Sequence, residues 1–308
     1  MRDGAPPVRF FCPGPVWVPE RIRNAIAEPI LHHRTAAFRA IMTEVREQLR
    51  RLWGADGWEP LVFACTGTGM MDGAVANFMR RGAKALVVSA GKFGERWGHA
   101  LRAYGCEVID MTLPWGGLVD VDATVNLLRA HPDIRAVYLT SADTSAGVEH
   151  DLKTLGPALR AHTDALIVID AICDFGGPRH LRPQAWGADI AVSCSQKCLM
   201  LPPGLGIATV APRAWEFYAS SDLPRFYLDW RKEYDRERRD DLTVAFRYFG
   251  DGRPMQWDDA STYVGEGTVQ ATWTYDYPHS LSEVVTVLLE AGLTLEAMHE
   301  GRTLPWQF

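Results

Sequence analysis

The chain has 308 residues, of which 47% are hydrophobic and 23% are charged, and its formal net charge at pH 7 is −6. This composition is ordinary for a globular protein, and the length allows one large domain and a smaller one. Basic residues are scattered along the chain, which argues against a nucleic-acid-binding surface. An apolar run of about 18 residues and the apolar core of a signal peptide are both missing, so we expect neither a membrane span nor secretion.

The cysteines and lysines limit the kinds of chemistry that this chain can perform. The six cysteines form no CxxC pair and show no metal-ligand spacing with histidine. We therefore expect reduced thiols in a cytoplasmic protein and no metal site. Lysine is scarce, with only five among the 32 basic residues. Any lysine-dependent chemistry must use one member of a short set: Lys84, Lys92, Lys153, Lys197 and Lys232.

Short apolar segments alternate with amphipathic ones over most of the chain. A first helix is expected over residues 34–53, beginning near Thr35 and ending near Gly54. The apolar segments predict seven strands, at residues 61–65, 85–89, 106–111, 135–140, 165–170, 189–194 and 206–210. The stretches between them predict helices at 69–81, 93–104, 121–130 and 152–162. Because the strands are continuously apolar, both of their faces should be covered. This predicts an α/β fold with a mostly parallel seven-stranded sheet flanked by helices.

The composition changes after residue 215. Residues 216–241 are interpreted as a mostly helical connector, because their second half is dense in charged and aromatic side chains. Residues 242–308 are rich in aromatic residues and predict two strands followed by a helix over 280–292, an atypical α+β segment. The expected domains are thus an N-terminal segment (1–18), a large domain (19–215), the connector and the C-terminal segment.

Two ionisable side chains follow predicted strands. Lys197 comes just after the segment 189–194, flanked by Cys, Leu and Met. Partial desolvation there would disfavour an ammonium group and free the amine as a nucleophile. Asp170 ends the segment 165–170, where a carboxylate points into the crevice in which α/β sheets bind ligands. Each has an ordinary alternative, namely a lysine that reaches out to solvent and an aspartate that caps a turn.

A glycine turn and an aromatic residue follow two other predicted strands. Thr66, Gly67 and Thr68 offer hydroxyls and free N–H groups at a helix N-terminus, which suits a phosphate, although glycine turns before helices are common. Phe93 opens the next helix, where its ring could stack on a planar ligand or pack in the core. Because all these residues follow strands of one sheet, we expect them to converge at the same sheet edge.

With these motifs in order, the sequence resembles class-V, fold-type-I aminotransferases of the alanine–glyoxylate and serine–pyruvate type. The resemblance covers roughly residues 8–235. It is carried by PGPVWVPERI (13–22), HHRTAAF (32–38), CTGTGMMDGAVAN (65–77), GKFGERWG (91–98), SADTSAGVEHDL (141–152), VIDAICDFGG (168–177) and SCSQKCLMLPPGLG (193–206).

This resemblance implies a homodimer that uses pyridoxal 5'-phosphate to move an amino group between a small amino acid and a 2-oxo acid. It implies that Lys197 is the catalytic residue and holds the cofactor as an imine. Asp170 would keep the pyridine nitrogen protonated, which makes the ring an electron sink. The complete set of cofactor-binding positions implied by the family is Thr66, Gly67, Thr68, Phe93, Thr144, Asp170, Ile172 and Gln196.

The family resemblance assigns these positions separate roles. The turn at 66–68 and Gln196 would bind the phosphate, which a partner subunit would also contact. Phe93 and Ile172 would lie on opposite faces of the cofactor ring, and Thr144 near its phenolic oxygen. Three residues depart from the family, which more often has His, Glu and Thr where this chain has Ser141, Asp143 and Ala146.

The C-terminal segment departs further from the family. Family members continue into a small domain whose arginine binds the substrate carboxylate, and we find no such domain here. Residues 242–308 instead resemble the terminal segment of class I S-adenosylmethionine-dependent methyltransferases, but without a glycine-rich nucleotide turn. Methyl transfer is therefore not expected. One alternative is a chimera that binds pyridoxal phosphate with impaired or no turnover. Another is that residues 269–285 are a diverged entry to the aminotransferase's own small domain.

Overall fold

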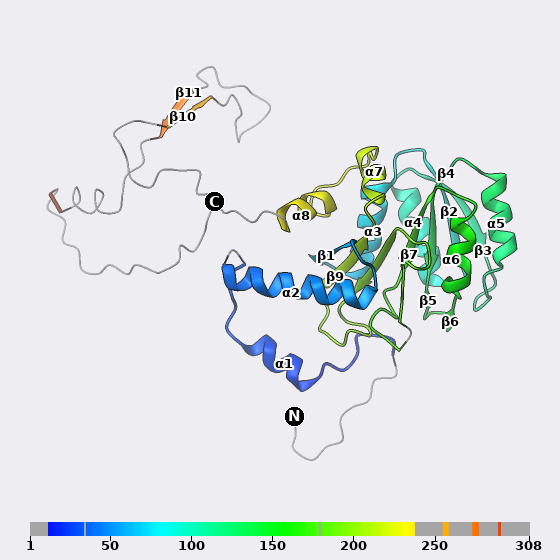
Figure 1. The fold of residues 1–308 in the computed structure, drawn as a ribbon, viewed down its shortest axis with the longest axis horizontal. Helices are drawn as coiled ribbons and strands as arrows, with labels where there is room; N and C mark the ends of the chain where they lie inside the picture. Colours follow the sequence, from blue (N-terminus) through cyan, green and yellow to red (C-terminus); the bar gives the residue numbers. More distant parts are fainter. Residues whose placement is uncertain are drawn as a thin grey trace, which may run out of the picture. The chain divides into compact units, whose positions relative to one another are not determined.

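The computed structural model describes residues 12–33, 35–178, 180–237, 255–258, 273–276 and 289–290. The chain divides into two compact units, residues 1–238 and 239–308. The first unit contains a seven-stranded sheet between two layers of helices (Figure 1). None of the described helices is long and apolar enough to cross a bilayer.

The sheet of the first unit has the strand order β1-β9-β8-β7-β4-β2-β3. Only β9 runs against its neighbours, so the other six strands are mutually parallel, which confirms the mostly parallel sheet. The strands are β1 (Glu59–Ala64), β2 (Lys84–Ser89), β3 (Glu107–Thr112), β4 (Ile134–Thr140), β7 (Leu166–Asp170), β8 (Ile190–Cys194) and β9 (Leu205–Val210). Each lies within two residues of its predicted bounds. A short ribbon, β5 (Ala142–Asp143) with β6 (Val148–Glu149), follows β4.

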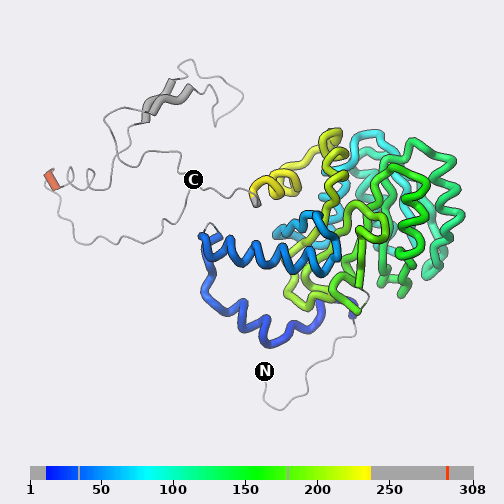
Figure 2. The backbone as a smooth tube through the Cα atoms, in the orientation of Figure 1, coloured from blue at the N-terminus to red at the C-terminus, as the bar shows by residue number. Residues whose placement is uncertain are grey.

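Eight helices are described in the first unit: α1 (Glu20–Ala27), α2 (Ala36–Trp53), α3 (Gly67–Phe78), α4 (Lys92–Ala103), α5 (Val121–Ala130), α6 (Leu152–Arg160), α7 (Ala214–Ala219) and α8 (Trp230–Glu237). The last turn of α2 packs with α5 and α6 on one sheet face. The other face is covered by α3, α4, α7 and α8. The chain path through these layers can be followed in Figure 2.

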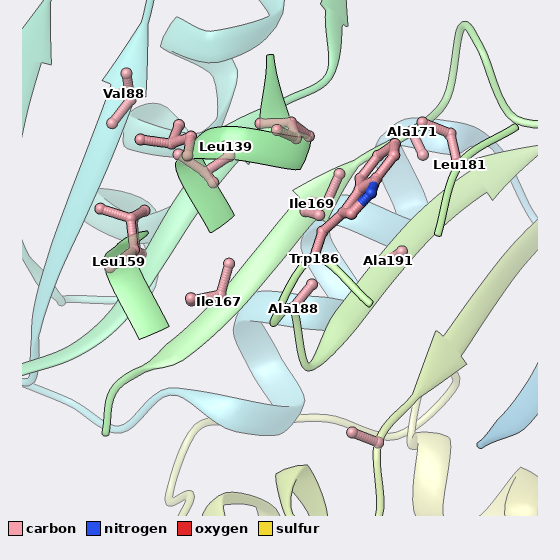
Figure 3. Packing of buried hydrophobic residues seen from close by; sticks show 14 of the residues in the cluster. Val88, Leu139, Leu159, Ile167, Ile169, Ala171, Leu181, Trp186, Ala188 and Ala191 are labelled. Carbon is pink, nitrogen blue, oxygen red and sulfur yellow. The ribbon is translucent and has the colours of Figure 1, made fainter. Parts of the chain in front are cut away.

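Alternate residues of the central strands feed the two cores, which explains their continuous apolarity. In β4, Val137 and Leu139 belong to the core under α5 and α6, whereas Ala136 and Tyr138 belong to the core under α3 and α4. Figure 3 shows the first of these cores, where Ile169 of β7 lies with Trp186 and Leu139. Burial of such side chains contributes about 25 cal/mol per Å² of apolar surface, which favours this three-layer arrangement.

Local capping fixes where helices begin and end. The Thr35 side chain accepts a hydrogen bond from the Phe38 N–H, and Gly54 ends α2 in the left-handed conformation (φ 56°), as predicted. The connector 216–241, expected to be mostly helical, is helical in its described part only at its start, in the last four residues of α7, and over Trp230–Glu237. Asp229 accepts hydrogen bonds from the N–H groups of Arg231 and Lys232, so the helix starts there.

The second unit contains a two-stranded antiparallel ribbon, β10 (Met255–Asp258) with β11 (Trp273–Asp276). Gln256 pairs with Tyr275, and Trp257 with Thr274. The helix expected over 280–292 lies outside the described residues except for two helical positions, 289 and 290. The resemblance of this segment to methyltransferases therefore stays a prediction.

Candidate functional site

Five loops meet at one edge of the sheet. They follow β1, β2, β4, β7 and β8, which run in the same direction and so end on the same side. These loops carry every residue singled out in the sequence: the turn 66–68, Phe93, Thr144, the pair Asp170 and Ile172, and the pair Gln196 and Lys197. The carboxyl edge of a parallel sheet is where α/β proteins bind ligands.

The turn after β1 leads directly into α3. Thr66 caps this helix, because its side-chain oxygen accepts a hydrogen bond from Gly69 N–H at 3.1 Å. The N–H groups of Gly67 and Thr68 precede the helical hydrogen-bond ladder and point out of the helix end. A Cβ on Gly67 would lie 2.9 Å from Ile172 Cδ1 and 3.3 Å from Cys194 Sγ. The turn therefore packs tightly against the loops after β7 and β8, and a side chain at residue 67 would push them apart.

Asp170 is a buried carboxylate that forms no ion pair with any cation of the described residues. It is 4% exposed, and its Oδ1 accepts a hydrogen bond from Ile172 N–H at 2.8 Å. Burial is the main cause that raises the pKa of Asp170 to about 7, and the negative charges of Asp174 and Asp143 contribute to the same shift. The Ile172 N–H and the more distant Arg96 act in the opposite direction without reversing the shift. A positively charged ligand group at this carboxylate would favour its ionised form.

Lys197 lies in the loop after β8, half-buried rather than fully enclosed. The N-terminal segment covers its aliphatic stem, because a Cβ on Gly14 would lie 2.4 Å from Lys197 Cδ. Figure 2 shows this segment running beside the loop, and Val16 N–H donates to Gln196 O at 3.3 Å. The charge of Lys197 and the charge of Asp170 both act on the thiol of Cys173. The amine and the carboxylate thus lie within electrostatic range of one group.

Ser195 fixes the shape of this lysine loop. The residue is fully buried, and its hydroxyl donates to Pro202 O at 2.6 Å and accepts from Leu205 N–H at 3.2 Å. Met200 closes the loop in the left-handed conformation (φ 57°), which costs a non-glycine residue about 1 kcal/mol or more. The loop is held in one conformation, which holds the backbone of Lys197.

Phe93 occupies the first turn of α4, and a remote aspartate fixes it there. The helix cap, Gly91, has no side chain to contribute. Asp143 replaces that cap, because its Oδ2 accepts hydrogen bonds from the N–H groups of Phe93 and Gly94, both at 3.0 Å. The guanidinium of Arg96 lies over the Phe93 ring, 5.0 Å from its centroid, and its Nη1 donates to Thr68 Oγ1 at 2.8 Å. One face of the Phe93 ring is therefore already occupied by Arg96.

Two polar residues complete the cluster. Thr144 Oγ1 lies 3.6 Å from Cys173 Sγ, which ties the loop after β4 to the loop after β7. Gln196 Oε1 is buried and forms no hydrogen bond with any described residue. A buried amide oxygen without a partner costs about 1–3 kcal/mol. This amide is therefore suited to a ligand.

Sequence reasoning missed four contributors: Gly14, Arg96, Asp143 in its capping role, and Ser195. Arg96 had a weak signal, because position i+3 from Phe93 on a helix places both side chains on one face. The bare Gly91 was a signal that α4 needed a cap from elsewhere. Nothing in the sequence indicated that Gly14 would contact Lys197, because 183 positions separate them.

The comparisons with known proteins match the part of the chain that carries the candidate site. The sequence profile described as "Aminotransferase class-V" matches residues 22–221. The chain is 39% identical over 225 residues to the soluble hydrogenase 42 kDa subunit of Anabaena cylindrica, covering 72% of this chain and 58% of that protein. It is 34% identical over 225 residues to the L-aspartate–glyoxylate aminotransferase of Paracoccus denitrificans, covering 72% and 57%.

Solved structures agree with the profile. The aspartate aminotransferase of subgroup IV from Thermus thermophilus superposes with a TM-score of 0.66 at 32% identity, over 73% of this chain and 62% of that one. The ureidoglycine–glyoxylate aminotransferase of Bacillus subtilis superposes with a TM-score of 0.72 at 26% identity, over 77% and 62%. The chain spans about three fifths of the length of the relatives it matches. Because the family profile matches well over half of its residues, the chain belongs to the class-V aminotransferases.

Proposed function

We propose that the protein binds pyridoxal 5'-phosphate at this sheet edge and transfers an amino group between a small amino acid and a 2-oxo acid, of the alanine/serine and glyoxylate/pyruvate type. One observation carries the proposal: Asp170 and Lys197 follow the neighbouring strands β7 and β8 at the same edge, and both act on Cys173. The names of similar proteins, which include aspartate– and serine–glyoxylate aminotransferases, support this substrate class.

The ring end of the cofactor fits the acidic side of the site. In the described part of the chain Asp170 forms no ion pair, and its carboxyl is held partly protonated near neutral pH by burial. A pyridine nitrogen there would share a proton with the carboxylate and relieve the cost of burying it. Ile172 and the free face of Phe93 would enclose the ring. Thr144 would lie beside the phenolic oxygen.

The phosphate end fits the turn before α3. The N–H groups of Gly67 and Thr68 point out of the start of a 12-residue helix, where an anion is favoured by the helix dipole. The side-chain oxygens of Thr66 and Thr68 already accept hydrogen bonds, and each hydroxyl can still donate one to a phosphate oxygen. Because Gln196 Oε1 has no partner among the described residues, the amide can turn to present its NH₂ group there, which is the donor a phosphate oxygen needs.

When bound, pyridoxal phosphate supplies an electron-withdrawing ring conjugated to the substrate's α-carbon. The chain's own residues then have separate tasks. Lys197 Nζ would hold the cofactor and, once the substrate amine has taken its place, would serve as the base that moves the proton of the substrate α-carbon. Asp170 Oδ would keep the ring nitrogen protonated. Phe93 and Ile172 would enclose the ring and leave one side of it open to Lys197.

Two experiments test the proposal. Titrating the purified full chain with pyridoxal phosphate should produce a visible absorbance band that Lys197→Ala removes and Lys232→Ala keeps. Adding alanine or serine should then convert the band to that of the amine form, and glyoxylate should restore it. An absent band would refute cofactor binding. A band that neither amino acid changes would instead favour the alternative of binding without turnover.

The proposal includes a homodimer. The first turns of α2 and the segment before it carry exposed apolar side chains, with Ile30 96%, Ile26 59% and Ile41 46% exposed. Isolated surface hydrophobes are normal, but a group of this size on neighbouring helices is typical of an interface. Sedimentation should give twice the chain mass. Charged residues at Ile26 and Ile41 together should halve that value.

We also propose a cytoplasmic location. All six cysteines are free thiols in the structure, and several of them lie around the site, where oxidation would disturb it. Proteins that keep such thiols are typical of reducing compartments. Fractionation of source cells, with thiol counting on the native protein, tests this. Recovery outside the cytoplasm with disulfides formed would contradict it.

A further inference from the structure

A cavity opens at the opposite edge of the sheet from the candidate site. Its volume is about 950 Å³, and it lies at the amino ends of β2, β3, β4 and β7, between the turns that precede those strands. Five cationic side chains line it, together with His162: Arg80, Lys84, Arg129, Arg135 and Arg160. Only three carboxylates do so, although the whole chain carries a net charge of −6. The cavity is thus locally positive on an acidic protein.

Arg135 is the most unusual of these side chains. It is half-buried at the start of β4, and its guanidinium donates only to neutral groups: Phe78 O at 2.9 Å, Phe217 O at 2.7 Å and Ser220 Oγ at 2.7 Å. No carboxylate of the described residues forms an ion pair with it. Burial lowers the pKa of Arg135, and the neighbouring charge of Arg80 lowers it further. The charge of Asp222 opposes this effect, but no carboxylate of the described residues forms an ion pair with either guanidinium.

A second pair of nitrogen groups shows the same arrangement. Arg129 Nη2 lies 3.4 Å from His162 Nε2. Neither residue pairs with a carboxylate in the described chain. An anion bound here would accept hydrogen bonds from the guanidinium of Arg129 and from a ring N–H of His162.

The cavity's carboxylates do not neutralise these two pairs. Asp133 is engaged by Lys84, 2.6 Å away. Arg160 forms an ion pair with the buried Asp189, and Arg213 forms an ion pair with the same carboxylate. Glu107 and Asp164 remain, and neither forms an ion pair with Arg80, Arg129 or Arg135 in the described chain. Holding like charges together in this way costs free energy that a bound anion would recover.

We propose that this cavity binds a small molecule bearing two anionic oxyacid groups, one at the Arg80–Arg135 pair and one at the Arg129–His162 pair. Guanidinium groups bind phosphate and carboxylate oxygens through two parallel hydrogen bonds, so both kinds of oxyanion suit them. The site is independent of the proposed amino transfer, because it lies at the other end of the strands and shares no residue with the candidate site.

Calorimetric titration of the full chain, saturated with pyridoxal phosphate so that the turn at 66–68 is filled, tests this with three probes. Inorganic pyrophosphate and succinate each carry two anionic groups, whereas orthophosphate carries one. At least one of the first two should bind saturably, and about tenfold more tightly than orthophosphate. The tighter of the two identifies the ligand as a phosphate compound or a dicarboxylate. No saturable binding by either would overturn the proposal.

The variant R80Q/R129Q removes one exposed guanidinium from each pair and leaves Arg135, which holds two backbone carbonyls, in place. Binding should weaken at least about tenfold. The control R51Q removes an exposed arginine of α2 that lies outside the cavity, and it should bind like the parent. Equal affinity of parent and double variant would locate the anion elsewhere and refute the assignment. Matching melting temperatures confirm that the variants are folded.

Discussion

Asp143 caps the helix that carries Phe93, although 50 positions separate the two residues. Its Oδ2 accepts the N–H of Phe93 and of Gly94 at 3.0 Å, and its Oδ1 accepts the N–H and hydroxyl of Ser145 at 3.1 and 2.6 Å. The carboxylate is 1% exposed. Gly91 leaves room for it, because a Cβ on Gly91 would lie 2.7 Å from Asp143 Cγ. Asp143, in the short strand β5 that follows β4, therefore positions the ring of Phe93 at the start of α4.

Removing this cap should cost stability and cofactor affinity together. Asp143→Ala should lower the free energy of unfolding by about 1–3 kcal/mol, because a helix cap is lost and buried N–H groups are left without acceptors. Asp120→Ala is the matched control, since Asp120 caps α5 by accepting Ala123 N–H at 3.0 Å on the surface. It should lose about 1 kcal/mol but bind pyridoxal phosphate normally. Equal affinity for both variants would contradict a positioning role for Asp143. Urea unfolding and cofactor titration give the two quantities.

The effect of the Asp143 charge on the pKa of Asp170 can be separated from the capping of α4 by the Asp143 side chain. Asp143→Asn keeps an oxygen acceptor at the helix start but removes a negative charge that helps to raise the pKa of Asp170. The pKa of Asp170 should therefore fall in this variant, while stability changes less than in the alanine variant. The pH dependence of the free energy of unfolding, measured without cofactor, reports that pKa. An unchanged titration would show that the two carboxylates are not coupled.

The turn at Gly67 should not tolerate a methyl group. Gly67→Ala would place its Cβ 2.9 Å from Ile172 Cδ1, and we expect a loss of about 1–3 kcal/mol together with weaker cofactor binding. Ile172→Val removes the nearest contact atom. The double variant should therefore recover part of both losses, as measured by thermal unfolding and cofactor titration. Additive losses in the double variant would exclude the contact as the cause.

The sheet and its bounds could be predicted because continuous apolar segments are a local signal. Strands such as β7 and β8 needed no partner information to be recognised. The strand order and the reversed direction of β9 could not be predicted, because they depend on which segments pair across the chain. The same limit applies to the site. Lys197 and Asp170 stood out by strand-end position, whereas the contacts of Asp143 with Phe93 and of Gly14 with Lys197 exist only after folding.

The pKa of Asp170 predicts how the cofactor-free protein responds to pH. An ordinary aspartate ionises near pH 4, but the folded carboxyl ionises near 7. Between these values the folded protein keeps a proton that the unfolded chain has lost, so stability falls as pH rises from about 4 to 7. The total loss is up to about 4 kcal/mol.

Asp170→Asn has no such group, so its stability should be flatter over the same range. Pyridoxal phosphate should also flatten the parent's curve, because a ring cation favours the ionised carboxylate. Urea unfolding at a series of pH values measures both effects. Parallel curves for the parent and the asparagine variant would mean that Asp170 ionises at its ordinary pH.

Mass spectrometry after borohydride reduction of the cofactor-treated chain shows which lysine binds pyridoxal phosphate. Reduction turns a carbon–nitrogen bond between the cofactor and an amine into a permanent adduct, and the chain has only five lysines that could carry one. We predict one pyridoxyl group per chain, on the peptide that contains Lys197. An adduct on another lysine, or spread over several lysines without preference, would contradict it.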